Sequence, residues 1–166
     1  MQEIDVVGVR IEIPTNSPVL VLREQENSRR VVTLYIGGPE ASAIHTALEG
    51  IQAPRPLTHD LCINLIEALD GRIDRVVLTE IKEQTYFAEI HVVHAGGTVH
   101  VSSRPSDAVA IALRVECPIF IEETLLDEVG KVVVEAVEES DEGEETAIID
   151  EFKDFIDNVN PEDFSD

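Results

Sequence analysis

The order of strand and helix patterns along the chain is the feature that most constrains its fold. Three runs rich in β-branched residues come first and are separated by turns rich in Asn, Ser and Pro: Glu3–Ile13, Pro18–Arg23 and Arg30–Ile36. Further strand patterns follow later in the chain: Arg72–Lys82, Thr85–Ala95, Thr98–Ser102 and Pro118–Ile121. Strands that follow one another through hairpins, with helices between two such groups, are typical of an α+β fold rather than of an alternating parallel one.

Three helices are predicted between and after these strands. The first begins at Pro39 and runs through Leu48, and the third runs from about Ser106 to Val115. The second begins at Thr58, and its apolar side chains recur at helical spacing: Leu61, Leu65, Ile66 and Leu69. We therefore expect an antiparallel or mixed sheet of about six to seven strands with three helices packed on it.

Charge divides the chain into a body and a strongly acidic C-terminal part. The 166 residues carry a formal charge of −22, and residues 128–166 hold fifteen acidic side chains against two Lys and Arg. The run Glu135–Glu145 has few apolar anchors and is predicted to be disordered. Apolar residues between Ile148 and Val159 repeat at three and four, which predicts a C-terminal amphipathic helix. The expected division is a domain over 1–130, a flexible linker over 131–147, and the helix and tail over 148–166.

The chain has no pattern of a secretory signal or of a membrane span. It begins directly with a strand pattern, and no apolar run approaches the roughly 20 residues that a spanning helix needs. We expect a cytoplasmic protein that makes no contact with membranes. Cys62 and Cys117 are interpreted as small core residues in a reducing compartment.

Two short motifs carry the chemistry that the sequence suggests. In Pro54-Arg55-Pro56-Leu57-Thr58-His59-Asp60 and in Arg104-Pro105-Ser106-Asp107, an arginine stands beside proline and a carboxylate follows in the first turn of a helix. Proline fixes its own backbone angle and restricts the residue before it, so each arginine is held in a narrow range of directions. Such rigid presentation suits the binding of a phosphate.

Phosphodiester cleavage needs charge neutralisation, a proton acceptor and, in many enzymes, a divalent ion. Arg55 and Arg104 match phosphate oxygens, and we assign Ser106 to the substrate with them. His59 is the candidate acid or base, and Asp60 and Asp107 complete the predicted catalytic set. Glu40, Asp60 and Asp107 are the candidate ligands of Mg²⁺ or Mn²⁺, which prefer oxygen donors.

Each of these residues also has a purely structural interpretation. A carboxylate in the first turn of a helix stabilises the free amide groups and the helix dipole without any metal. Arg55 and Arg104 can equally form ion pairs with those same carboxylates, and Ser106 can be a turn residue. His91 and His100 lie on the polar face of a predicted hairpin, where we expect them diagonally placed, without a third metal ligand and exposed to solvent.

Several blocks of the sequence, taken together, resemble a known family. These are Leu34-Tyr35-Ile36-Gly37 with Glu40-Ala41 and Ala43-Ile44, then Pro54 to Leu61, Arg104 to Ala112, and Pro118-Ile119. Over about residues 3–127 the chain resembles the bifunctional nuclease family, and Phe152 to Phe164 is similar to the C-terminal extension of its bacterial members. The resemblance implies a cytosolic α+β domain that self-associates as a homodimer or higher homo-oligomer and cleaves both DNA and RNA.

Two functions are consistent with the sequence. The first is a metal-assisted nuclease that cleaves phosphodiester bonds in single-stranded or flexible nucleic acid, which it holds weakly because the chain lacks a broad basic surface. The second is a non-catalytic dimeric interaction or regulatory protein whose arginine–carboxylate sites bind a ligand or another subunit. The resemblance favours the nuclease, whereas the net charge favours the second function.

Overall fold

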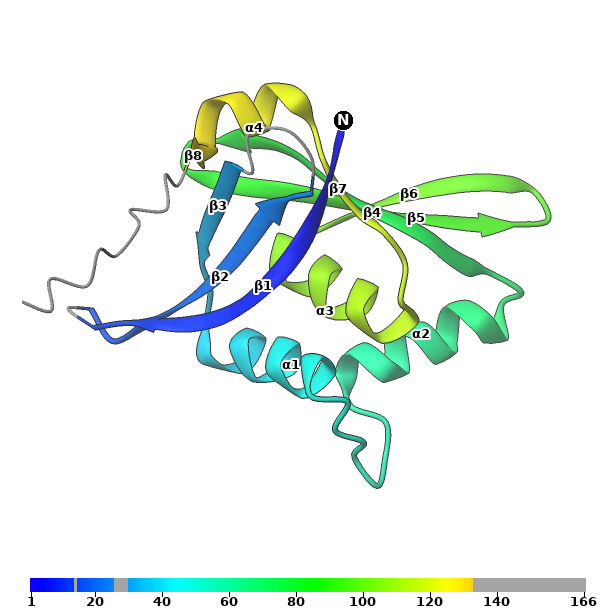
Figure 1. The fold of residues 1–166 in the computed structure, drawn as a ribbon. Coiled ribbons are helices and arrows are strands. Elements are labelled where there is room, and N and C mark those ends of the chain that lie inside the picture. The colour runs from blue at the N-terminus through cyan, green and yellow to red at the C-terminus, as the bar shows by residue number, and fades with distance from the viewer. Residues whose placement is uncertain (14, 26–29, 133–166) are drawn as a thin grey trace, which may run out of the picture. The chain divides into compact units, whose positions relative to one another are not determined.

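The computed structural model describes residues 1–13, 15–25 and 30–132. Within them the predicted α+β class is confirmed, because one mixed sheet of eight strands packs with four helices (Figure 1). The strands are β1 (Gln2–Glu12), β2 (Ser17–Glu24), β3 (Arg30–Tyr35), β4 (Arg72–Lys82), β5 (Thr85–His94), β6 (Gly97–Ser103), β7 (Ile119–Ile121) and β8 (Lys131–Val132). The helices are α1 (Gly38–Leu48), α2 (Thr58–Ala68), α3 (Pro105–Val115) and α4 (Glu123–Val129). The sequence patterns did not predict β8 or α4.

The sheet has two wings. One consists of β6, β5, β4 and β7, the other of β1, β2, β3 and β8, and they join where β1 pairs with β7. The strand order is β6-β5-β4-β7-β1-β2-β3-β8, and every pairing is antiparallel except that of β4 with β7. The first residues of β1 pair with β7, and its remainder pairs with β2. A bulge between Val6 and Gly8, whose φ is 148°, shifts the register of β1 against β2. Bulges bend strands, so this position helps β1 to join the two wings.

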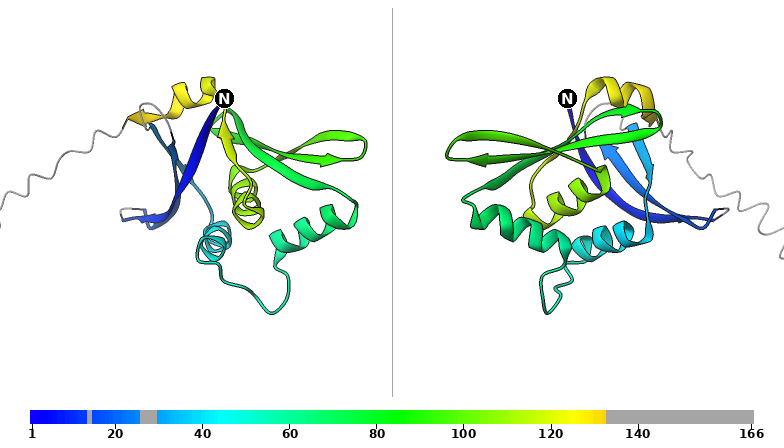
Figure 2. Two further views of the ribbon diagram at one scale, coloured as in Figure 1. Left: turned by 45° about the vertical axis from the view of Figure 1, so that its right-hand side comes forward. Right: turned by 180° about the vertical axis from the view of Figure 1, so that it is seen from behind.

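Helix α3 lies between the two wings and forms the centre of the core (Figure 2). Five consecutive residues, Ala108 to Ala112, are buried, which is typical of a helix that is covered on all sides. Three of the five are alanines, and their small side chains allow close approach of the neighbouring elements. The start of α3, which carries the second arginine motif, is therefore held in a fixed position.

Helix α2 buries a different face from the predicted one. Ile63 is 9% exposed and Ile66 packs against the core, whereas Leu61, Leu65 and Leu69 are 51%, 56% and 79% exposed. The interpretation of Cys62 as a core residue is wrong for the same reason, because its position on α2 is exposed. Cys117 is half-buried against the core as expected, and burial raises the pKa of its thiol to about 11.

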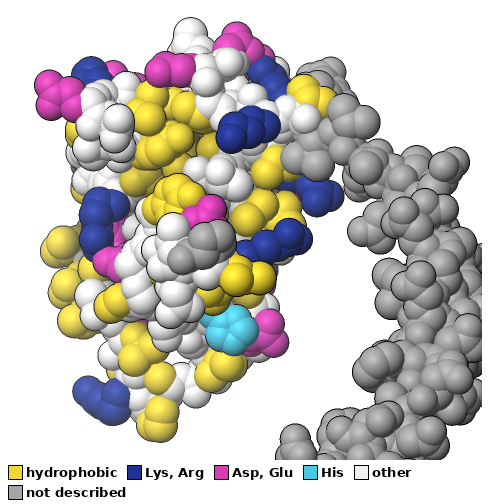
Figure 3. Space-filling model, turned by 90° about the vertical axis from the view of Figure 1, so that its left-hand side faces the viewer, with side chains coloured by type: hydrophobic (Ala, Val, Ile, Leu, Met, Phe, Trp, Pro, Cys, Tyr) yellow, Lys and Arg dark blue, Asp and Glu magenta, His cyan; other side chains and the backbone are white. Residues whose placement is uncertain are grey.

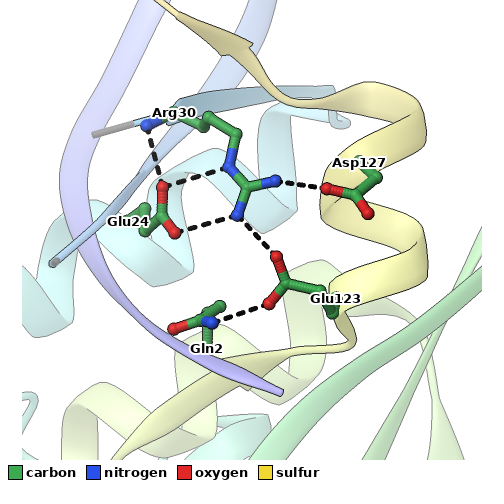
Figure 4. Close-up of polar contacts among 5 residues, drawn as sticks. All are labelled: Gln2, Glu24, Arg30, Glu123 and Asp127. Carbon is green, nitrogen blue, oxygen red and sulfur yellow. Dashed lines mark hydrogen bonds and ion pairs between the residues drawn. The ribbon is translucent and has the colours of Figure 1, made fainter. Parts of the chain in front are cut away.

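A network around Arg30 joins strands β1, β2 and β3 to α4 (Figure 4). The Arg30 guanidinium donates to both carboxylate oxygens of the buried Glu24, at 3.1 and 2.9 Å, and to Glu123 at 2.8 Å. Asp127 on α4 accepts from the same guanidinium, and Gln2 on β1 donates to Glu123 at 2.7 Å. Strands β1, β2 and β3 and helix α4 are thus tied together around one arginine.

The body of the chain forms one compact unit over Met1–Val133. It includes β8, so Lys131 and Val132 pair with β3 as part of the body. The predicted linker beyond Val132 and the predicted C-terminal helix lie outside the described residues. Among the residues that the structure describes, no helix combines the length and the apolar character needed to cross a membrane.

Candidate active site

The two arginine motifs meet in space. His59, at the start of α2, places Nε2 3.1 Å from Oδ1 of Asp107 at the start of α3. The His59 side chain is only 15% exposed, so the contact is largely shielded from solvent. The motifs are separated by forty-eight positions in the chain, and their side chains are in direct contact.

Arg104 connects this pair to a third helix. Its Nε donates to Oδ2 of Asp107 at 2.8 Å, and its NH2 donates to Oδ1 of the same carboxylate at 3.2 Å. Its NH1 lies 2.9 Å from Oε1 of Glu40, in the first turn of α1. We call Glu40, His59, Arg104 and Asp107 the motif cluster, and three helix starts contribute to it.

The charges of the motif cluster stabilise one another. Burial alone would raise the pKa of the Asp107 carboxyl, but hydrogen bonds from Arg104 and His59 outweigh burial, and this pKa is lowered. The bonds to Asp107, and then the contact with Glu40, raise the pKa of Arg104 further. Asp107 is therefore a fixed negative group at neutral pH that can orient His59.

Asp60 lies outside the motif cluster and accepts hydrogen bonds from Leu57 and Arg114. Its Oδ2 accepts the backbone N–H of Leu57 at 2.8 Å, and its Oδ1 accepts Nε of Arg114 at 2.8 Å. The Leu57 bond is the main cause of the lowered pKa of Asp60, and Arg114 adds to it against the effect of burial. Asp60 thus serves as a helix cap and as an ion-pair partner. Arg114, which is 10% exposed, had no assigned role in the sequence because its partner is fifty-four residues away.

Arg55 and Ser106 differ in their exposure to solvent. Arg55 is exposed and forms no ion pair with any residue of the described ranges; it lines an open hollow together with Asp60, Arg72 and Arg114. Ser106 is 7% exposed at the start of α3. Arg55 lines this hollow and Arg104 does not, so the two predicted phosphate-binding arginines lie in different surroundings.

The carboxylates predicted to bind a metal are all engaged by arginine. Glu40 and Asp107 contact Arg104, and Asp60 contacts Arg114. These three acids do not form a group with donor atoms within 4.8 Å of one another in the part of the chain that the structure describes. An Mg²⁺ or Mn²⁺ ion at Glu40, Asp60 and Asp107 stays a prediction, because it has to compete with two guanidinium groups.

A different group of donor atoms lies elsewhere in the fold. Glu89, His91 and His100 bring their ligand atoms within 4.8 Å of one another. The expected diagonal placement of the two histidines is wrong, because β5 and β6 pair His91 directly with His100. Glu89 was missed as a third ligand, although strand alternation places it on the same face as His91.

The surface shown in Figure 3 carries acidic, basic and apolar side chains that are interspersed. Up to Asp127 the chain has nineteen acidic residues against ten Lys and Arg. Non-specific affinity for nucleic acid comes mainly from contacts of basic side chains with phosphates. The body of the chain therefore has fewer basic than acidic side chains to offer for such contacts.

Fold and site together define an α+β domain in which three helix starts gather arginine, carboxylate and histidine side chains. A family model for the bifunctional nuclease domain matches residues 20–134, and the chain belongs to this family. An uncharacterized protein of Mycobacterium tuberculosis is 44% identical over 99% of this chain and 98% of its own length. Bifunctional nuclease 1 of Arabidopsis thaliana is 23% identical over 72% of this chain and 38% of its own length. Bifunctional nuclease 1 of Oryza sativa subsp. indica is 24% identical over 70% of this chain and 36% of its own length.

Proposed function

We propose that this protein is a nuclease that cleaves phosphodiester bonds in DNA and RNA at the motif cluster. The observation that carries the proposal is the contact of His59 with Asp107, beside Arg104. A histidine held by a carboxylate is a common source of general acid–base catalysis, because the carboxylate fixes the ring and its tautomer. The family membership and the names of the plant relatives support the same assignment.

The proposed roles follow from the contacts. When Nε2 of His59 carries the hydrogen and donates it to Asp107, Nδ1 is left with a lone pair that can accept a proton from an attacking water. Arg55 is exposed on a proline-restricted loop, and its guanidinium, which no described residue engages in an ion pair, can bind phosphate oxygens. Arg104 supplies positive charge beside the histidine and positions Asp107 through two hydrogen bonds.

The proposed substrate is single-stranded or flexible nucleic acid. Few arginines are placed near the motif cluster, so the enzyme neutralises few phosphates and binds weakly. A flexible strand can bend to present one phosphate to Arg55 and another to the motif cluster, whereas a stiff duplex needs a broad complementary surface. A divalent ion at Glu40, Asp60 and Asp107 remains part of the hypothesis, and none of the roles described above depends on it.

Cleavage by the Asp107→Asn variant tests these roles. This substitution keeps the size of the side chain but removes the charge that orients His59, and we expect the rate to fall by at least about 100-fold. Purified protein should be assayed on labelled single-stranded DNA and RNA with Mg²⁺, with Mn²⁺ and with chelator, and circular dichroism should verify the fold. Glu49→Gln, which changes an exposed carboxylate after α1, is the matched control. An unchanged rate in Asp107→Asn would remove His59 and Asp107 from the mechanism.

A second candidate is a non-catalytic protein that acts as a dimer. The exposed leucines Leu61 and Leu65 of α2, with Leu69 directly after it, favour this candidate because they form an uncovered apolar stripe. The acids and Arg104 of the motif cluster then serve only as structural ion pairs. Sedimentation of the wild type and of a Leu61→Gln, Leu65→Gln double variant tests this candidate. A dimer that the double variant loses, in a protein without nuclease activity, would establish it.

A further inference from the structure

Three side chains on the β5–β6 hairpin converge outside the motif cluster. Oε2 of Glu89 lies 3.5 Å from Nε2 of His91 and 3.2 Å from Nδ1 of His100. The two imidazole rings are stacked, with centroids 3.9 Å apart and planes inclined by 12°. Strand pairing places His91 opposite His100, but it does not by itself bring the side-chain atoms of both histidines and of Glu89 together.

His91 contributes an unusual feature to this group. Its Nε2 is inaccessible to solvent and has no hydrogen-bond partner among the described residues, since the contact with Glu89 does not meet hydrogen-bond geometry. Buried polar atoms without a partner are rare in proteins, and a bound ion can satisfy such an atom. An unprotonated Nε2 offers a lone pair to such an ion.

We propose that Glu89, His91 and His100 form a binding site for a divalent transition ion of the Zn²⁺ class. In a tetrahedral site with bonds of about 2.0–2.1 Å, neighbouring donor atoms are about 3.3–3.4 Å apart. The two separations that involve Glu89, 3.5 and 3.2 Å, are close to this value. Two imidazoles and one carboxylate fill three positions, and the fourth is open to water or another ligand.

The chemistry of the donors selects the ion. Imidazole nitrogen suits Zn²⁺, Co²⁺ and Ni²⁺, whereas Mg²⁺ prefers a full set of oxygen ligands. The rings must turn out of their stacked arrangement so that both lone pairs point at one ion, and rotation about the terminal ring bond of histidine is soft. Arg75 lies opposite His91 on β4 and is a nearby positive charge, but its guanidinium is paired with Asp74 at 3.0 Å.

The proposed metal site lies outside the motif cluster and does not depend on the proposed nuclease function. Ala88 and Ile90 point from β5 into the core that α3 helps to form, so Glu89 and His91 point away from it. The proposed metal site therefore lies on the face of the hairpin that is turned away from α3. Its immediate effect is to link β5 to β6, the outermost pair of strands of this wing.

Calorimetric titration of Zn²⁺ into the chelator-treated full chain tests the proposal. We expect about one tightly bound ion per chain, and at least about 100-fold weaker binding in Glu89→Gln and in His100→Ala, because loss of a supporting group alone typically costs 10- to 100-fold. His45→Ala, which removes an exposed histidine of α1, should bind like the wild type. Titration with Co²⁺ should give the visible absorption of a tetrahedral nitrogen–oxygen site, and the two variants should lose it.

Three results would overturn the proposal. Equal affinity in the wild type, Glu89→Gln and His100→Ala would place the ion on other acidic groups. Loss of binding in His59→Ala but not in His100→Ala would place it at the motif cluster. Zn²⁺ that binds no more tightly than Mg²⁺ would remove the nitrogen-rich site. Glu89→Gln conserves side-chain size and His100 is 52% exposed, so both variants should fold; circular dichroism verifies this.

Discussion

Single residues of the motif cluster serve the fold and the proposed chemistry together. Asp60, beside that cluster, caps α2 through Leu57 and holds Arg114, although its position in the first turn was equally consistent with a metal ligand. The sequence predicted one catalytic set drawn from both motifs, and His59 and Asp107 of that set are in contact, whereas Asp60 and Arg55 lie outside the motif cluster. It did not predict the pairings of Asp60, because these depend on the approach of α3 and of Arg114, which are distant in sequence.

The pH dependence of Asp60 gives a test at this scale. The folded protein holds the pKa of Asp60 below its ordinary value of 3.8, so its stabilising contribution is complete above about pH 5 and is lost as pH falls through 3.8 and below. In Asp60→Asn we expect the free energy of unfolding at pH 7 to fall by about 0.5–1 kcal/mol, typical of a weakened cap. Urea unfolding between pH 7 and pH 3 should show a smaller loss of stability in the variant. Parallel curves for the two proteins would contradict the role of Asp60.

At the scale of elements, α2 shows why its buried face could not be predicted from spacing alone. Its leucines recur every four residues, and this longer apolar stripe faces solvent, while the shorter stripe with Ile63 faces the core. Both stripes satisfy the helical period, so only the position of the neighbouring strand decides between them. The same limit applied to β8 and α4, which are short and depend on contacts with distant segments.

Alanine substitutions on the two stripes of α2 distinguish them. Ile63→Ala removes a buried side chain, and we expect the free energy of unfolding to fall by about 2–4 kcal/mol. Leu65→Ala, whose side chain is 56% exposed, should change it by less than about 0.5 kcal/mol. Chemical denaturation of both variants measures the difference. A larger loss in Leu65→Ala would mean that the leucine stripe is covered in solution.

The Arg30 network links elements rather than residues of one strand. Arg30→Met removes a guanidinium that neutralises the buried Glu24 and the ion pairs that it makes with α4, so we expect a loss of about 3 kcal/mol in the free energy of unfolding. Arg10→Met, at an exposed position of β1, should have little effect. Chemical denaturation of the two variants gives the comparison. Equal stabilities would show that the buried carboxylate is stabilised without Arg30.

For the whole molecule, the net charge disfavours binding of nucleic acid, whereas the family suggests a nuclease. The proposed site is consistent with both observations. A net charge of −22 disfavours extended contact with nucleic acid, whereas the family is that of bifunctional nucleases. A compact cluster that acts on one phosphate at a time needs no basic surface. The fold class and the meeting of the motifs were predictable from element order, whereas the register that pairs His91 with His100 required the structure.

The rate of cleavage by His59→Ala shows whether His59 is the catalytic group of the proposed nuclease site. Single-turnover cleavage of a labelled single-stranded oligonucleotide should be measured for the wild type, His59→Ala and the control His45→Ala at equal protein concentration. General acid–base catalysis contributes about 10²- to 10⁴-fold to a reaction rate. We therefore expect the cleavage rate to fall by at least about 100-fold in His59→Ala and to equal that of the wild type in the control. Equal rates in all three proteins would contradict a catalytic role for His59.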